Sequence, residues 1–83
     1  MKTDINIDAE AEAMVKAVLH NRQMGYIADV EVIFNQHPQT TWRQYSAAPP
    51  QFPKPIFNGS RRAWTRATLK GELIRRMTST KAA

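Results

Sequence analysis

The sequence predicts a single α+β domain that is mainly helical, with one two-stranded β-hairpin and an extra helix at the N-terminus. Three observations lead to this fold class. Residues 8–22 repeat their apolar side chains at helical spacing. A run rich in proline, residues 49–55, prevents any helix from continuing through the middle of the chain. An Asn58-Gly59 dipeptide then separates two short stretches with strand character.

Composition narrows the class of protein. The 83 residues suffice for one compact domain. The absence of cysteine excludes disulfide frameworks and thiolate zinc sites, and fits a reducing cytoplasm. Apolar runs are far shorter than the roughly 18–20 residues that span a bilayer, and the first residues are acidic rather than basic. We therefore expect a soluble cytoplasmic protein without membrane contact.

The charge is distributed unevenly along the chain. Its net value is +5, yet residues 1–22 hold three basic and four acidic groups, residues 23–46 one and two, and residues 47–83 eight and one. Clustered Lys and Arg bind phosphates favourably because counterions are released. The C-terminal part is therefore expected to meet a polyanion, and a merely solvated basic surface is the alternative.

The first helix is predicted over residues 8–22, with Asp8 as its N-terminal cap. Glu12 and Lys16 have the spacing of an ion pair on its outer face. We expect the apolar face to pack on the core, and dimerisation through that face is the alternative. The residues of this face are Ala11, Met14, Val15, Val18 and Leu19.

Two short helices are predicted next. Ile27, Val30, Ile33 and Phe34 repeat like a helix, although Val30 to Val32 also alternate like a strand. Pro38 suits the first turn of another helix of about eight residues. At about 100° per residue, its inward side comprises Thr41, Trp42 and Tyr45, and its outward side comprises Gln39, Thr40, Arg43 and Gln44. Outward side chains of these types pair with base edges and phosphates.

A hairpin and a last helix complete the chain. Ile56-Phe57 forms a short strand, Asn58-Gly59 supplies the positive φ angles of a tight turn, and a strand returns through residues 61–64 with Trp64 buried. The last helix begins near Thr65 and carries Leu69, Leu73 and Met77 on one stripe, while Gly71 weakens it. Residues 78–83 are predicted to form a disordered tail.

This order of elements is that of a winged helix-turn-helix. The segment QFPKPIFNGSRRAWTRATL resembles the signature of the AlpA and phage excisionase family of small, MerR-like DNA-binding proteins, and TTWRQY resembles the family's recognition helix. The resemblance covers about residues 26–77. The chain departs from the family at Ala67, where a capping Ser or Thr is usual, at Glu72, where an aromatic is common, and in the turn NQHPQ, which lacks the usual Gly.

The resemblance implies a sequence-specific DNA-binding protein of a phage or integrated element, acting as an excisionase, a transcriptional regulator or both. Its partners would be double-stranded DNA and integrase, and such a small domain favours two or more copies on adjacent sites. The expected contacts come from a recognition helix, a wing and flanking positions. These are Gln39, Thr40, Arg43 and Gln44 in the helix, Lys54, Asn58, Ser60, Arg61 and Arg62 in the wing, and Arg66 and Lys70 beside it.

Other classes of function find less support. His20 and His37 fall in different elements, and we expect His37 to cap or to precede the short helix. No phosphate-binding loop or nucleophile motif is present. We therefore expect no enzyme, no cofactor and no metal. One alternative is a protein-interaction inhibitor that uses the same fold against an integrase, a kinase or another host protein. RNA or general nucleic-acid binding through the basic tail is another.

Overall fold

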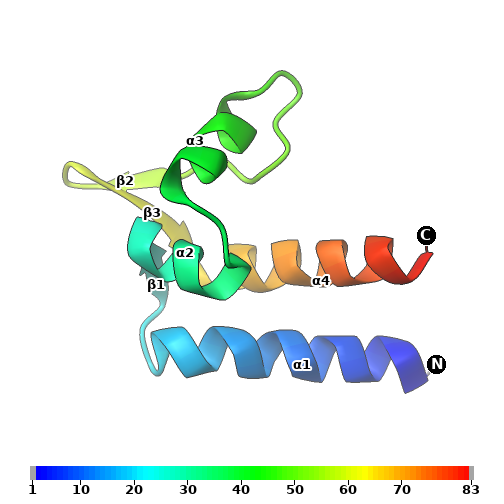
Figure 1. The fold of residues 1–83 in the computed structure, drawn as a ribbon. Coiled ribbons are helices and arrows are strands. Elements are labelled where there is room, and N and C mark those ends of the chain that lie inside the picture. The colour runs from blue at the N-terminus through cyan, green and yellow to red at the C-terminus, as the bar shows by residue number, and fades with distance from the viewer. Residues whose placement is uncertain (1, 83) are drawn as a thin grey trace.

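The computed structural model describes residues 2–82 of the chain, and the side chains of residues 6–79. This part holds four helices and one three-stranded antiparallel sheet, so the α+β class is confirmed. Figure 1 shows how they are arranged. The elements are α1 (Lys2–Leu19), β1 (Met24–Tyr26), α2 (Ile27–Phe34), α3 (Pro38–Ser46), β2 (Ile56–Asn58), β3 (Arg61–Thr65) and α4 (Arg66–Ala82).

The two long helices, α1 and α4, lie side by side and antiparallel, with both chain ends at the same end of the molecule (Figure 1). The apolar face of α1 is buried in the core, as expected, through Ile7, Ala11, Val15 and Leu19. Met14 lies at the edge of this face and is 41% exposed, so its predicted burial is wrong. α1 also begins before Asp8 and ends earlier than predicted, at Leu19.

The sheet has the strand order β1-β3-β2, and β1 was not predicted from the sequence. In β1, Gly25 pairs with Trp64 of β3. A Cβ at Gly25 would lie 2.6 Å from Cδ1 of Leu69, a buried residue of α4. Glycine therefore lets the first strand pass directly over the last helix.

The predicted hairpin forms between β2 and β3, with its turn one residue later than expected. Asn58 remains in the ladder and pairs with Arg61, so Gly59 and Ser60 are the central residues of the turn. Gly59 has a φ of 69°, and Asn58 does not take the positive φ that the sequence suggested. A glycine at the first central position is the requirement of a type II′ turn.

Helices α2 and α3 follow each other closely, as predicted, across the turn Asn35 to His37. Asn35 adopts the left-handed conformation, with φ 51° and ψ 52°, and so replaces the glycine that the sequence lacks here. The Nδ1 of His37 accepts a hydrogen bond from the backbone N–H of Gln39 at 3.1 Å, and Pro38 occupies the first turn. The predicted capping role of His37 is confirmed.

The inward side of α3 is narrower than predicted. Thr41 is fully buried and Tyr45 is half-buried, but Trp42 is 53% exposed, so its predicted position on the inward side is wrong. Thr41 and Tyr45 are four residues apart and share one line on the helix, whereas Trp42 is rotated about 100° away from Thr41. The Nε2 of Gln36 donates to Oγ1 of Thr41 at 2.6 Å, which fixes this side inward.

Trp64 is buried, as the sequence predicted, and is 1% exposed. Its Nε1–H donates to the carbonyl oxygen of Pro53 at 2.7 Å, within the crossover, residues 47–55, that joins α3 to β2. Its ring meets Phe52 and Tyr45 edge-on, with centroids 5.8 and 6.1 Å away. The indole therefore links β3, the crossover and α3.

α4 begins where the sequence predicted. The Oγ1 of Thr65 accepts a hydrogen bond from the backbone N–H of Thr68 at 3.2 Å, so Thr65 caps the helix, and Ala67 need not. The helix runs through Ala82, beyond the point where the sequence predicts a disordered tail, and Ala83 lies outside the described residues.

Gly71 provides a test of the packing around α4. Apart from its chain neighbours and the adjacent backbone of α4, no atom lies within 4 Å of a Cβ built at this exposed position. Gly71→Ala should therefore raise the free energy of unfolding by about 0.5–1 kcal/mol, because alanine loses less backbone entropy. Urea denaturation measures the change. The matched control, Gly25→Ala, should lower stability by about 1–3 kcal/mol because it displaces Leu69. A Gly71→Ala variant less stable than wild type would contradict this packing.

Candidate nucleic-acid interface

Acidic residues of α1 neutralise basic residues of α4. The Lys70 Nζ lies 3.1 Å from Asp8 Oδ1 and 3.3 Å from Glu12 Oε1, and Arg66 lies 3.3 Å from Glu12 Oε2. Glu12 thus pairs with residues of α4. The sequence had suggested a pair between Glu12 and Lys16, and that prediction is wrong. The hydrogen bonds from Arg66 and Lys70 lower the pKa of Glu12.

Arg66 also supports the backbone after α1. Its NH1 group donates to the carbonyl oxygens of His20, at 2.7 Å, and Arg22, at 3.1 Å. Arg66 and Lys70, which the sequence placed beside the DNA, therefore face α1, and the structure does not bring them together with the other predicted contact residues.

A third carboxylate, that of Glu72, pairs with two further arginines, and because one carboxylate balances only one guanidinium, this cluster keeps one net positive charge. Its oxygens accept from Arg75 Nε at 3.0 Å and NH2 at 2.6 Å, and from Arg76 Nε at 2.8 Å. Burial disfavours the charged form, but these hydrogen bonds outweigh it and leave the pKa of Glu72 below its ordinary value.

Arg76 draws α3 into this network. It donates to Oε1 of Gln36 and to Oε1 of Gln44, both at 3.1 Å, and its guanidinium lies over the rings of Phe34 and Phe52. Gln44 also accepts from Nε2 of Gln36 at 3.2 Å. The amide oxygen of Gln44, a predicted base-reading residue, is therefore used inside the protein.

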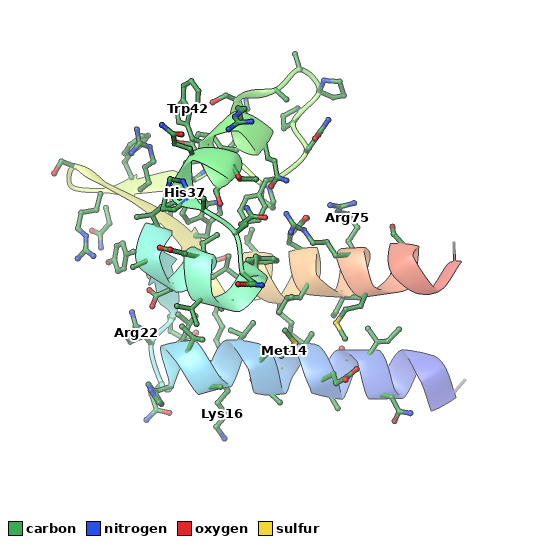
Figure 2. All side chains as sticks on the ribbon, in the orientation of Figure 1. Met14, Lys16, Arg22, His37, Trp42 and Arg75 are labelled. Carbon is green, nitrogen blue, oxygen red and sulfur yellow. The ribbon has the colours of Figure 1, made fainter. Side chains whose placement is uncertain are left out.

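Five basic side chains have no carboxylate within 4.0 Å among the described side chains. Lys16 points away from the outer side of α1, opposite α3 and its Trp42 (Figure 2). The other four lie on α3, in the crossover and on the hairpin: Arg43, Lys54, Arg61 and Arg62. Most of the cations without a carboxylate partner therefore lie on α3, the crossover and the hairpin, where the sequence predicted DNA contacts.

The outward side of α3 presents three different chemical groups. Gln39, Trp42 and Arg43 are exposed, and Thr40 is half-buried. This side thus combines an amide, an indole and a guanidinium next to one another on a nine-residue helix. Amide and guanidinium groups can form paired hydrogen bonds with base edges, and the indole adds apolar area.

The hairpin holds its two arginines on opposite faces. Strand alternation places Arg61 on the face of Tyr26 and Ala63, and Arg62 on the face of Phe57, its cross-strand partner. Phe57 is 66% exposed. Ser60 is exposed in the turn, and Lys54 is exposed in the crossover.

Tyr26 is a contact of the hairpin that sequence reasoning missed. The Arg61 Cζ lies 3.8 Å from the centroid of the Tyr26 ring, and Nδ2 of Asn58 donates to the Tyr26 hydroxyl at 2.9 Å. Tyr26 and the hairpin are far apart in the chain, and only the pairing of β1 with β3 brings them together. The exposure of Trp42 was also missed, because helical geometry alone placed Trp42 on the same side of α3 as Thr41 and Tyr45.

Asp29 anchors the start of α2 beside this contact. It accepts from the backbone N–H of Tyr26 at 2.9 Å and from both terminal nitrogens of Arg22, at 3.0 and 3.1 Å. Partial burial opposes ionisation, but the hydrogen bonds from Arg22 and Tyr26 leave the pKa of Asp29 below its ordinary value.

The described part of the chain, residues 2–82, shows no sign of a metal site or of a membrane-spanning helix. No group of three or more His, Cys, Asp or Glu residues there could hold a metal ion. None of its helices combines the length and apolar character needed to cross a membrane. Comparison of the chain with protein-family models, curated proteins and solved structures gave no match.

The Glu72 ion pairs predict acid sensitivity. Because the folded-state pKa of Glu72 lies below its ordinary 4.5, the stability that it contributes is fully present above that value and is lost as pH falls through the folded pKa. Glu72→Gln should therefore lower the free energy of unfolding by about 1–3 kcal/mol at pH 7, and should lose less stability than wild type on acidification. Urea denaturation between about pH 7 and pH 3 measures both effects.

Glu10→Gln is the matched control for this experiment, because Glu10 is exposed and has no ion pair among the described residues. Its free energy of unfolding should fall with decreasing pH in the same way as that of the wild type. If wild type and Glu72→Gln lose unfolding free energy equally steeply as the pH falls, the Glu72 pairs do not stabilise the fold.

Proposed function

We propose that this chain is a sequence-specific double-stranded-DNA-binding protein with a winged helix-turn-helix architecture. In this proposal α2 and α3 form the helix-turn-helix, α3 enters the major groove, and the β2–β3 hairpin is the wing. The resemblance of residues 26–77 to the AlpA and excisionase signature supports it, as does the order of the elements.

The observation that carries the proposal is the location of the uncompensated cations. The carboxylates of α1 and Glu72 pair with the described basic groups on α4, while Arg43, Lys54, Arg61 and Arg62 have no carboxylate partner among the described side chains. Phosphates reward clustered positive charge, and a DNA-binding domain needs this charge on the elements that approach the duplex. Four of the five described cations without a carboxylate partner lie on these elements, and the fifth, Lys16, lies on α1.

The two elements have different tasks in the proposal. Gln39, Thr40 and Arg43 read base edges, with Arg43 as the bidentate partner of a guanine. Arg61 and Arg62 contact backbone phosphates or the narrow minor groove of A-tract DNA, and Asn58 and Ser60 add polar contacts near the turn. Lys54 contacts a phosphate between the two. The proposal assigns no DNA contact to Gln44, Arg66 and Lys70, because their side chains have partners within the protein.

At the level of biology, the proposal is an excisionase, a transcriptional regulator, or a protein that combines both roles. The two roles share one physical act, the binding of a specific duplex, and an excisionase would also recruit an integrase. Binding of two or more copies to adjacent sites would raise the limited affinity of one small domain.

A second candidate function is inhibition of another protein through the same surface. The observation that favours it is the exposure of two large aromatic side chains, Trp42 at 53% and Phe57 at 66%. Aromatic residues are enriched at protein–protein interfaces, where a buried indole often dominates the affinity. Absence of duplex binding at low salt would favour this candidate over the first.

Arg43 tests base reading. After selection of a preferred duplex from a random library, Arg43→Ala should weaken binding to that duplex by about 1–3 kcal/mol and binding to random duplex much less, because it removes a base contact. Fluorescence anisotropy with both duplexes measures the difference. An equal loss on the two duplexes would assign Arg43 to the phosphate backbone instead.

The hairpin arginines test backbone contact. Arg61→Ala combined with Arg62→Ala should weaken binding to selected and random duplex alike and reduce the slope of log affinity against log salt by about one or two. The matched control is Lys16→Ala, which removes an unpaired cation from the opposite side of the molecule (Figure 2). Lys16 has no carboxylate partner among the described side chains, and its loss should change neither affinity nor slope beyond a small long-range effect. An unchanged affinity in the double variant would remove the hairpin from the interface.

A further inference from the structure

Arg61 and Arg62 are neighbours in sequence but differ in how the fold holds them. β1 and β2 flank β3, and the register pairs Tyr26 with Ala63 and Asn58 with Arg61. Tyr26, Asn58 and Arg61 therefore share one face of the sheet. The Tyr26 ring reaches both members of the last residue pair before the turn: the guanidinium lies over its face, and the Asn58 amide donates to its hydroxyl.

Tyr26 is itself held in place. Its backbone N–H donates to Asp29 at 2.9 Å, and Arg22 binds both carboxylate oxygens of Asp29. The tyrosine therefore stands at the junction of β1 and α2 with its backbone fixed and its ring half-buried. The hairpin end, in contrast, projects away from the helices (Figure 1). Tyr26 is thus the connection between the anchored part of the sheet and this end.

The stacking contact leaves Arg61 available for a ligand. A guanidinium that lies over an aromatic ring uses its flat face, and its N–H groups point outward in its own plane. None of these N–H groups donates a hydrogen bond to any side chain or backbone that the structure describes. A planar group with free donors in a restricted orientation suits bidentate binding of a phosphate.

Arg62 has no comparable support. It lies on the opposite face of the hairpin, where its cross-strand partner, Phe57, is itself largely exposed. Among the described residues no ring or carboxylate restrains its guanidinium. Arg62 can contribute long-range attraction, but it must lose its side-chain freedom at the moment of binding.

We propose that Tyr26 is a positioning residue that presents Arg61 as a preordered phosphate-binding group, so that Arg61 rather than Arg62 fixes the orientation of the hairpin on a DNA backbone. The ligand is a phosphodiester group of duplex DNA, and this inference rests on the proposed function. Its consequence is specific: Tyr26 contributes to DNA affinity only through Arg61.

A double-mutant cycle tests this coupling with a random-sequence duplex of about 20 base pairs at low salt. Tyr26→Leu should weaken binding about threefold to tenfold, because it removes the stacking and frees the arginine. In an Arg61→Ala background the same change should have less than about a twofold effect, whereas in an Arg62→Ala background it should keep its full effect. Tyr26→Phe retains the ring and loses the Asn58 hydrogen bond, and it should keep most of the wild-type affinity.

Two results would separate the failure of this inference from the failure of the proposed function. If the wild-type protein binds no duplex, both fail. If the wild-type protein binds and Tyr26→Leu weakens binding equally with and without Arg61, the DNA-binding function stands and the positioning role is wrong. Thermal unfolding of each variant shows whether a loss of affinity merely reflects a loss of fold.

A measurement on the free wild-type protein tests the preordering without any variant. The ¹⁵Nε–¹Hε relaxation of the two arginines reports the mobility of each side chain. Arg61 should be clearly more ordered than Arg62, and addition of duplex should change the order of Arg61 less than that of Arg62. Equal mobility of the two side chains in the free protein would overturn the proposal.

Discussion

One buried indole, that of Trp64, fixes the hairpin relative to α3. It donates to the carbonyl oxygen of Pro53 at 2.7 Å and meets the rings of Phe52 and Tyr45 edge-on. β3 carries Trp64 near one end and the arginine pair at the other, and α3 carries Tyr45 on its inward side and Arg43 on its outward side. The two parts of the proposed interface therefore have a fixed separation before any ligand binds, which lowers the entropic cost of engaging both at once.

Charge pairing defines the second constraint. Ion pairs within the protein balance part of the large positive excess of the C-terminal half, because Asp8 and Glu12 of α1 neutralise Lys70 and Arg66, and Glu72 pairs with two further arginines and balances one of their charges. α1 thus has two physical roles: it closes the core with its apolar face and provides counter-charges for α4. The cations that remain lie mainly on α3, the crossover and the hairpin, which is why the proposed function is assigned to that side.

Much of the fold could be predicted from local signals. Periodicity identified the helices, the prolines identified the crossover, and Gly59 together with alternation identified the hairpin and the burial of Trp64. The three-residue strand β1 gave no such signal, because its structure depends on pairing with β3, distant in the sequence. The turn lies one residue later than predicted, because Asn58 pairs with Arg61 in the sheet and binds Tyr26 instead of taking a positive φ.

The candidate site was less predictable than the fold, because the partners of charged side chains come from elsewhere in the chain. Residue type alone made Gln44, Arg66 and Lys70 resemble Arg43 and Arg61, and only the tertiary structure shows that the first three already have partners. Trp42 illustrates the same limit in reverse. Helical geometry placed it on the inward side, yet Thr41 and Tyr45 occupy that side of α3 and leave the indole in solvent.

The most direct test of the account is a chemical-shift map of the ¹⁵N-labelled protein during titration with duplex DNA at low salt. The account predicts that the largest changes in backbone amide shifts fall on residues 39–43 of α3 and 58–62 of the hairpin. The amides around Lys16 on α1 should remain nearly unchanged. A map centred on α1 and α4, or no change at any residue with excess duplex, would contradict the central claim that α3 and the hairpin form one DNA-binding surface.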